Sequence, residues 1–284
     1  MESKSRKFRK LLGEPGAVLM PVAHDAITAK IIEKLGYKTL AVGGFATAAV
    51  NYGLPDLGLI GLKEIAEATK NISSAVDLPI LADADGGYGN EVNMSRTIRE
   101  LEISGAAAIF IEDQEHPKRC GHLDGKILIS KENMVRKIKS ALKSRAGSDL
   151  VIIARTDAIA VEGLESAIDR AHAYAEAGCD VIFVEAPRSK EELARIANEI
   201  KEVPLLVNML DGGKTPILSK AELEKMGYKI IAYPVTTLLA SIKAIEAVLE
   251  KLKRDGSTEN CKSDLCDMNH FRELVDLKGW LDRK

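Results

Sequence analysis

Eight short apolar segments rich in β-branched residues alternate along the chain with longer segments of helical periodicity. Apolar strands joined by helices pair in parallel, because the crossover helices cover the sheet. Eight such units can close into a barrel, and an open doubly wound sheet is the alternative. The predicted strands are Ala17–Val22, Thr39–Val42, Pro79–Ala82, Ala107–Glu112, Leu150–Thr156, Val181–Glu185, Pro204–Asn208 and Lys229–Ala232.

The segment after the first predicted strand favours the barrel. A dinucleotide-binding open sheet would have a glycine-rich turn at this point, whereas the chain reads PVAHDA. A length of 284 residues also suits one α/β barrel. We therefore predict a TIM-type (β/α)₈ barrel over residues 1–252. Its connecting helices include Ala26–Leu35, Leu62–Val76, Val92–Ser104, Lys131–Ser144 and Leu164–Ala177.

Residues 253–284 exceed what a closed barrel needs. They start with the polar stretch KRDGSTENCKSD and end in MNHFRELVDLKGWLDRK, which is amphipathic and contains the only tryptophan. So apolar a stretch is not expected to stay free in solvent. We expect a C-terminal helical segment that docks on a barrel, either that of another subunit or its own.

The composition excludes several classes of protein. Charges of both signs are interspersed, with a net charge of −2 and 4% aromatic residues, so no nucleic-acid-binding surface is expected. No apolar run reaches the roughly 18 residues of a membrane span. The N-terminus MESKSRKFRKLL is interpreted as a helix that covers the barrel rather than as a targeting peptide. We expect a cytoplasmic protein with four free cysteines that binds neither nucleic acid nor membrane.

Polar residues or paired glycines follow seven of the eight predicted strands. In α/β barrels the active site lies at the C-terminal ends of the strands. The convergence of these residues at one mouth therefore predicts a functional site. They are His24 and Asp25, Gly43 and Gly44, Asp83 and Asp85, Glu112 and Asp113, Arg155 and Asp157, Glu185, and Asn208.

Asp83 and Asp85 end the third predicted strand, in the motif LADADGGYGN. As strand positions two residues apart they would point the same way. Like charges on one face repel unless a cation or a proton lies between them. With Glu112 from the next strand they form an all-oxygen set suited to Mg²⁺, or alternatively Mn²⁺. Capping of the turn at Gly86 is the structural alternative.

The fifth strand ends at Arg155, and its guanidinium needs an anionic partner. A substrate carboxylate and an internal partner (Glu112, Asp157 or Glu185) are both open. The longest connection between a strand and the next helix runs from about residue 113 to 129, and such loops are usually functional lids. Within it Lys118, Arg119 and His122 surround Cys120. Cationic neighbours would lower the pKa of this thiol and make it a proton donor or nucleophile.

Six motifs in order resemble the isocitrate lyase and phosphoenolpyruvate mutase superfamily over nearly the whole chain. They are GLPDLG at 53–58, DADGGYGN at 83–90, IEDQ at 111–114, PKRCGH at 117–122, IIARTDA at 152–158 and NMLDGGKTP at 208–216. The resemblance implies Mg²⁺ held by Asp83 and Asp85, with Glu112 in support through water. It implies that the substrate is a small carboxylic acid. The residues implied to contact it are Gly43, Gly44, Phe45, Asp56, Gly121, Arg155, Glu185 and Asn208.

The resemblance also implies the chemistry. Lyases of the family cleave a 2-hydroxy acid into a 2-oxo acid and a carboxylic acid. Cys120 would protonate the carbanion left by cleavage, and Gly121 and His122 would shape the loop that carries it. Arg155 would stabilise the charge that develops on the other fragment. Members commonly form homotetramers in which a C-terminal helix crosses to a partner's barrel, which implies the same exchange here.

The substrate is narrowed by departures from the family pattern. Methylisocitrate lyases usually have an arginine, which serves a further carboxylate, where Leu239 stands here, a tyrosine at Ala41 and a serine at Gly43. A carboxylate without a partner in a closed site costs several kcal/mol. We therefore expect a substituted malate such as 2,3-dimethylmalate rather than 2-methylisocitrate, with the general base unassigned. Alternatives are a carboxyphosphonoenolpyruvate-type phosphonomutase, an oxaloacetate hydrolase (although relatives tend to have serine at Thr236), and a non-catalytic metabolite-binding barrel.

Overall fold

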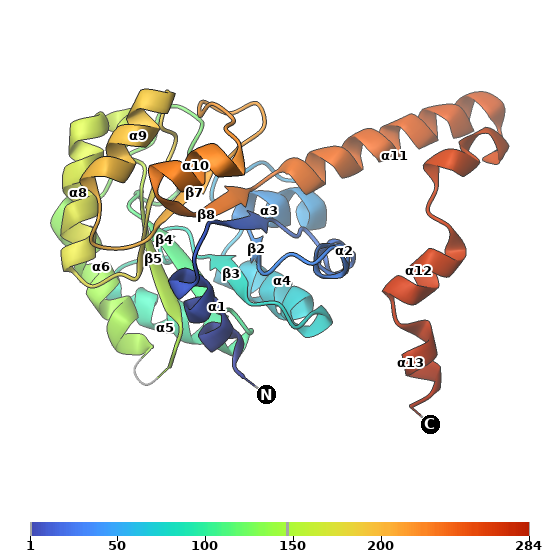
Figure 1. Ribbon diagram of the computed structural model, residues 1–284, viewed down its shortest axis with the longest axis horizontal. Helices are drawn as coiled ribbons and strands as arrows, with labels where there is room; N and C mark the ends of the chain where they lie inside the picture. Colours follow the sequence, from blue (N-terminus) through green and yellow to red (C-terminus); the bar gives the residue numbers. More distant parts are fainter. Residues whose placement is uncertain (1, 146–147, 284) are drawn as a thin grey trace.

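The computed structural model describes residues 2–145 and 148–283 and contains one eight-stranded parallel sheet closed into a barrel (Figure 1). Strand β1 pairs with β8, and the order then runs through β7, β6, β5, β4 and β3 to β2. A parallel bridge between Val22 and Ala41 joins β1 to β2 and closes the ring. The predicted barrel is thus confirmed. The strands are β1 (Val18–Pro21), β2 (Leu40–Val42), β3 (Ile80–Asp83), β4 (Ala108–Glu112), β5 (Val151–Thr156), β6 (Val181–Val184), β7 (Leu205–Asn208) and β8 (Tyr228–Tyr233).

The helices surround this barrel, and the five predicted from periodicity are present within one or two residues of their expected ends. Two short helices, α3 (Gly44–Tyr52) and α7 (Ala158–Val161), were not predicted, because each follows its strand within one residue and lacks a polar face. Gly105 and Gly178, with φ of 93° and 99°, follow helix ends in the positive-φ conformation that glycine adopts most readily. The barrel helices are α1 (Lys4–Gly13), α2 (Ala26–Lys34), α3 (Gly44–Tyr52), α4 (Leu62–Ala75), α5 (Glu91–Ile103), α6 (Lys131–Ser144), α7 (Ala158–Val161), α8 (Leu164–Glu176), α9 (Lys190–Glu199) and α10 (Lys220–Met226).

The N-terminal helix α1 covers one end of the barrel. Its Phe8 is 1% exposed and belongs to the same buried cluster as Met20, Val151 and Ile230 on the barrel strands. Burial of such a side chain contributes about 1.5–3 kcal/mol. The interpretation of the basic N-terminus as a covering helix is therefore confirmed. With that end covered, a ligand can reach the barrel interior from the opposite end, where the strands terminate.

The C-terminal helix α11 (Thr236–Asp255) extends away from the barrel as an arm (Figure 1). It continues past the expected end near Leu252, so that the predicted linker is partly helical. The remainder of the chain forms a 3₁₀ helix, η1 (Glu259–Asp264), and helices α12 (Met268–Leu274) and α13 (Leu277–Leu281). No helix in the described part of the chain is long and apolar enough to cross a lipid bilayer.

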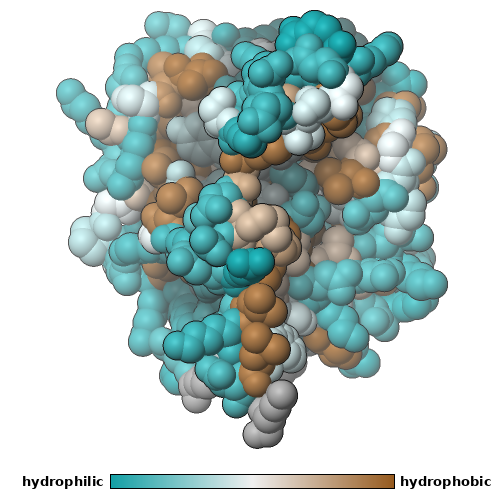
Figure 2. Space-filling view, turned by 90° about the vertical axis from the view of Figure 1, so that its right-hand side faces the viewer, coloured by the Kyte–Doolittle hydropathy of each residue, from teal (hydrophilic) through white to brown (hydrophobic). Residues whose placement is uncertain are grey.

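The arm leaves apolar side chains in solvent. In this helix Leu238 is buried, whereas Ile245 and Leu249 are 57% and 55% exposed. The segment behind it makes modest contact with its own barrel, where Lys34 Nζ lies 3.4 Å from Glu273 Oε2. A stripe of apolar side chains runs across this side of the molecule (Figure 2). Subunit exchange through this arm stays a prediction.

We predict that the arm holds an oligomer together. Ending the chain at Lys253, or changing both Ile245 and Leu249 to Glu, should lower the mass measured by light scattering, because each removes apolar contact between subunits. Glu246→Gln, on the same helix, is the control and should leave the mass unchanged. An arm variant with the mass of the full-length protein would show that the arm does not hold the assembly.

Candidate active site

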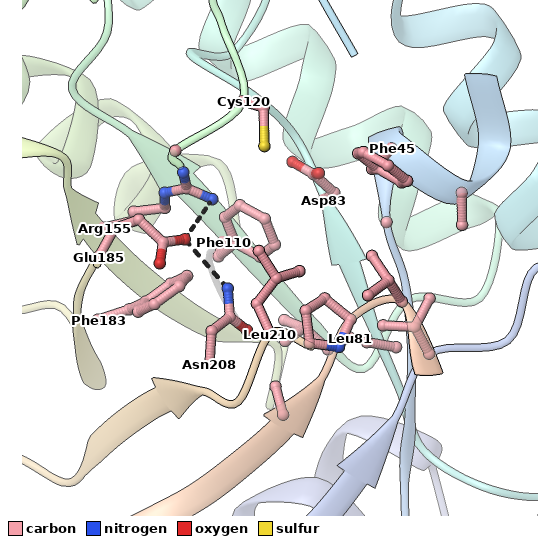
Figure 3. Close-up of a pocket in the computed structure, with 18 of the residues that line it drawn as sticks. Phe45, Leu81, Asp83, Phe110, Cys120, Arg155, Phe183, Glu185, Asn208 and Leu210 are labelled. Atoms are coloured by element: carbon pink, nitrogen blue, oxygen red, sulfur yellow. Dashed lines mark hydrogen bonds and ion pairs between the residues drawn. The ribbon is translucent and has the colours of Figure 1, made fainter. Parts of the chain in front are cut away.

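A cavity of about 90 Å³ opens at the C-terminal ends of the strands. Arg155, Glu185 and Asn208 lie on one side of it together with Phe110 and Phe183, whereas Phe45 and Leu81 lie on the other side with Asp83 (Figure 3). Of the residues predicted to bind the metal or the substrate, Gly44, Asp85 and Glu112 are not part of its lining, although each contacts a residue that is. His24, Asp25, Asp113 and Asp157, which were also predicted at the mouth, are not part of the lining either. The predicted residues that do line it are Gly43, Phe45, Asp56, Asp83, Cys120, Gly121, His122, Arg155, Glu185 and Asn208.

Arg155 is the charged centre of this cavity. Its guanidinium, 8% exposed, donates through Nε and Nη2 to Asp157 at 2.9 and 3.0 Å. Glu185 Oε2 lies 3.2 Å from Nη1, and Glu112 Oε2 lies 3.5 Å from Nε. All three internal partners considered from the sequence are therefore present at once. Three carboxylates around one guanidinium leave a net negative charge that a further cation can offset.

Glu185 is held in its ionised form. Burial opposes its charge, but Arg155 and His122 outweigh that cost and lower its pKa to about 2. Asn208 Nδ2 donates to its Oε2 at 3.0 Å. Neutral pH thus leaves Glu185 a fixed hydrogen-bond acceptor next to the cavity, suited to a hydroxyl group.

The two aspartates of β3 approach each other differently from the prediction. The strand ends at Asp83, and Asp85 follows it with a left-handed φ of 44°, so the two are not alternate positions of one strand. Asp83 Oδ1 accepts from Asp85 N at 2.9 Å, and Oδ2 accepts from Gly44 N at 2.9 Å. Gly44 was expected to contact the substrate, but its backbone N–H already donates a hydrogen bond to Asp83.

The carboxylates behind the cavity fit a divalent cation only with water in its shell. Glu112 Oε1 is buried and has no hydrogen-bond partner among the described residues, whereas the buried Asp85 Oδ1 forms an ion pair with Lys118. Burial raises the pKa of Asp85 to about 6 and that of Glu112 well above its usual value. In the described chain no three carboxylate, imidazole or thiol groups are close enough to hold one ion directly. Mg²⁺ commonly binds one or two carboxylates and keeps several waters, so the residues present fit it on those terms.

Lys118 supplies positive charge to this acidic cluster. Its Nζ lies 2.5 Å from Asp56 Oδ1 and 3.0 Å from Asp85 Oδ1, and the side chain is almost fully buried. Burial opposes its charge, but the surrounding carboxylates raise the pKa of Lys118 well above its usual value. The lysine thus points at the carboxylates and away from the thiol that it was expected to activate.

Cys120 is a protonated thiol rather than an activated thiolate. Burial raises the pKa of Cys120 above its usual value, and the nearby carboxylates of Asp56 and Glu185 add to the effect. Arg119 turns outward and donates to Asp124 O at 3.2 Å. The expectation that neighbouring cations lower the pKa of Cys120 is wrong, because Lys118 pairs with Asp56 and Asp85 and Arg119 turns outward. A thiol that keeps its proton at neutral pH is suited to act as an acid.

The loop that carries Cys120 is packed against the site. A Cβ added to Gly121 would lie 2.4 Å from Arg155 Nη2 and 2.5 Å from Glu185 Cγ, so only glycine allows this approach. His122 Nε2 lies 3.2 Å from Glu185 Oε1, and its Nδ1 accepts from Lys214 N at 2.9 Å. Residues 120–122 thus line the cavity, with Gly121 packed against Arg155 and Glu185 and with the His122 ring next to Glu185.

Two aromatic walls were missed by the sequence reasoning. The rings of Phe110 and Phe183 pack edge to face, and the Arg155 guanidinium lies 5.8 and 5.1 Å from their centroids. Each phenylalanine precedes a predicted site residue, Glu112 or Glu185, by two positions on its strand. Residues two apart on a strand face the same side, so strand alternation could have identified both rings.

These features define an α/β barrel with a charged, closable site at the mouth. The family model "Phosphoenolpyruvate phosphomutase" matches residues 8–253. The 2,3-dimethylmalate lyase of Eubacterium barkeri is 42% identical over 272 residues, covering 96% of this chain and 94% of the relative. The 2-methylisocitrate lyase of Aeropyrum pernix is 44% identical, covering 99% and 89%. The chloroplastic carboxyvinyl-carboxyphosphonate phosphorylmutase of Arabidopsis thaliana is 41% identical, covering 97% and 82%.

Solved structures agree. An oxaloacetate acetylhydrolase in complex with the inhibitor 3,3-difluorooxalacetate is 32% identical with a TM-score of 0.94, covering 99% of this chain and 95% of that one. A phosphonopyruvate hydrolase in complex with oxalate and Mg²⁺ is 28% identical with a TM-score of 0.89, covering 99% and 98%. The chain belongs to the phosphoenolpyruvate mutase and isocitrate lyase superfamily, as its motifs indicated.

The raised pKa of Cys120 predicts slow alkylation. At a given pH above neutrality less of it is thiolate than of an ordinary thiol, and thiolate is the reactive form. Iodoacetamide should therefore modify Cys120 more slowly at pH 8 than the exposed Cys266 of the same chain, followed by peptide mass spectrometry. The rate at Cys120 should rise steadily as the pH is increased. Faster reaction at Cys120 than at Cys266 would contradict a raised pKa.

Proposed function

We propose that the protein is a Mg²⁺-dependent carbon–carbon lyase that cleaves a substituted malate into pyruvate and a carboxylic acid. The observation that carries the proposal is the position of Cys120, a protonated thiol that lines the same cavity as Arg155 and Asp83. Cleavage of a 2-hydroxy acid leaves one fragment as a carbanion, which needs a proton. The 2-hydroxyl loses its proton to a base as its oxygen becomes the carbonyl of the 2-oxo acid, and the negative charge on that oxygen before the carbon–carbon bond breaks needs a cation.

The residues divide this work by their charge. Glu185 accepts the hydrogen bond of the 2-hydroxyl, since it is ionised and fixed by Asn208. Arg155 faces the carboxylate end of the substrate, and Cys120 donates its proton to the fragment that departs. Asp83 and Asp85 would hold Mg²⁺, with Glu112 in support through water. When bound, that ion would act as a Lewis acid toward negative charge on the substrate oxygen that becomes the 2-oxo group.

The remaining walls of the cavity favour a methyl-substituted dicarboxylate. Fixed positive charge in the lining comes from Lys118 and Arg155, both already paired with carboxylates. Leu239, where relatives have the arginine for a further carboxylate, is 44% exposed and not part of the lining. A third carboxylate would therefore have no partner. The apolar part of the lining comprises Met20, Val22, Leu81, Phe110, Phe183, Leu206 and Leu210.

A product assay tests the proposal. The protein should release pyruvate from 2,3-dimethylmalate in the presence of Mg²⁺, detected with lactate dehydrogenase, and do so faster than from 2-methylisocitrate. Oxaloacetate and phosphonopyruvate complete the panel, with phosphorus-31 NMR to detect phosphonate rearrangement. Cys120→Ser should lose about 10²-fold or more in kcat, because a positioned acid contributes about that much.

Other outcomes of the same panel would replace the proposal. Rearrangement of phosphonopyruvate would identify a mutase, and oxalate release from oxaloacetate would identify a hydrolase. Pyruvate release that the serine variant retains in full would show that Cys120 is not the acid. No turnover of any of the four, with the fold intact, would favour a non-catalytic barrel.

We further predict that activity depends on a divalent cation held by Asp85. Asp85→Ala should abolish turnover and weaken Mn²⁺ binding measured by electron paramagnetic resonance, with little change in melting temperature because the mouth is not the core. Asp25→Asn is the matched control, since Asp25 also follows a strand but accepts from Thr28 N at 2.7 Å as a helix cap. Full turnover in excess EDTA would refute the metal assignment.

A further inference from the structure

A buried lysine lies inside the loop that carries Cys120, and the proposed chemistry does not use it. Lys126 is 6% exposed, although its neighbours Gly125 and Ile127 are exposed. Its ammonium turns back along the chain and donates to the carbonyls of Gly121 and Leu123, the latter at 2.7 Å. The Lys126 side chain thus joins the carbonyls of Gly121 and Leu123, the first and third residues after Cys120.

The cost of this burial indicates a specific role. No carboxylate in the described part of the chain lies within ion-pair distance of Lys126, unlike Lys118 in the same loop. A buried ammonium is unfavourable unless its protons are taken up by acceptors, and burial accordingly lowers the pKa of Lys126. The acceptors are loop carbonyls, so the energy of those bonds depends on the conformation of the loop.

These carbonyls belong to the part of the loop that must be placed accurately. Gly121 packs so closely on Arg155 that a Cβ would lie 2.4 Å from the guanidinium. Two neighbouring loop residues use other contacts, since Gln114 bonds the backbone of Arg119 and Lys214 N donates to His122 Nδ1. For the carbonyls of Gly121 and Leu123, Lys126 is the side-chain donor among the described residues.

We propose that Lys126 is the positioning residue of the 120–123 turn, holding the thiol of Cys120 at the cavity through the carbonyls of Gly121 and Leu123. Lys126 touches no substrate itself and acts through the conformation of the turn. Without it the turn has two unpaired carbonyls and moves toward water. The proposal deepens the lyase assignment, on which its catalytic consequence rests, but its structural consequence concerns the thiol alone.

The experiment measures exposure of the thiol directly. In the full-length protein with Cys266→Ser, which removes the exposed cysteine, iodoacetamide should alkylate Cys120 roughly tenfold faster in Lys126→Met than in the parent, because the unpaired carbonyls open the turn. The matched control is Lys131→Met, just beyond the loop, where the lysine pairs with Asp169 at 2.6 Å on the surface. Its rate should equal that of the parent. Buried Cys179 reports general loosening and should stay unmodified.

A second variant and the assay of pyruvate release complete the test. Lys126→Gln retains an amide donor with shorter reach and should give an intermediate alkylation rate. In the lyase assay Lys126→Met should lower kcat more than it raises KM. Equal alkylation of Cys120 in parent, Met and Gln variants would overturn the proposal, as would a parallel rise at Cys179. Faster alkylation without any lyase activity in the parent would leave the positioning role standing and remove the proposed function instead.

Discussion

The arrangement of the site depends on the neutralisation of buried negative charge at the barrel mouth. Four carboxylates, those of Asp85, Glu112, Asp157 and Glu185, are each at most 3% exposed, and the cations that face them are Arg155 and Lys118. A buried carboxylate is costly unless it is paired or protonated. Glu185, 3.2 Å from Arg155, has a lowered pKa, whereas the pKa of Glu112, 3.5 Å from the same guanidinium, is raised because burial outweighs that cation. A divalent cation would add the positive charge that Glu112 lacks.

The loop over the mouth takes part in the same balance. It supplies Lys118 to Asp56 and Asp85, and it brings His122 to Glu185. Closure of the loop is therefore favoured by the charge beneath it as well as by packing. The same closure buries Cys120 and keeps its proton in place. The proposed acid role of Cys120 is thus coupled to the charge of the site through one segment, whose conformation we propose that the ammonium of Lys126 supports.

The aromatic and aliphatic side chains that line the cavity bear on how this charged site would select a small acid under the proposed function. Phe110 and Phe183 contact Arg155 and exclude water from one side of it. In such surroundings an interaction between a guanidinium and a carboxylate is stronger than in water. Under the proposed function, the apolar lining favours alkyl substituents over a further charged group. Relatives of both lyase and mutase type are about 40% identical to this chain, so the barrel by itself does not identify the substrate.

The sequence by itself determined the barrel, its strands within one or two residues, and the polar residues of the cavity, because strand and helix periodicity is local and parallel strands align their ends at one mouth. The order of the six motifs along the chain indicated the family. Only the tertiary structure decided which partner each charged side chain contacts. It placed Lys118 on Asp85 rather than beside Cys120, gave Asp85 a left-handed backbone, and occupied the amide of Gly44 with Asp83. Such choices depend on which distant groups share a buried space, and no local pattern records that.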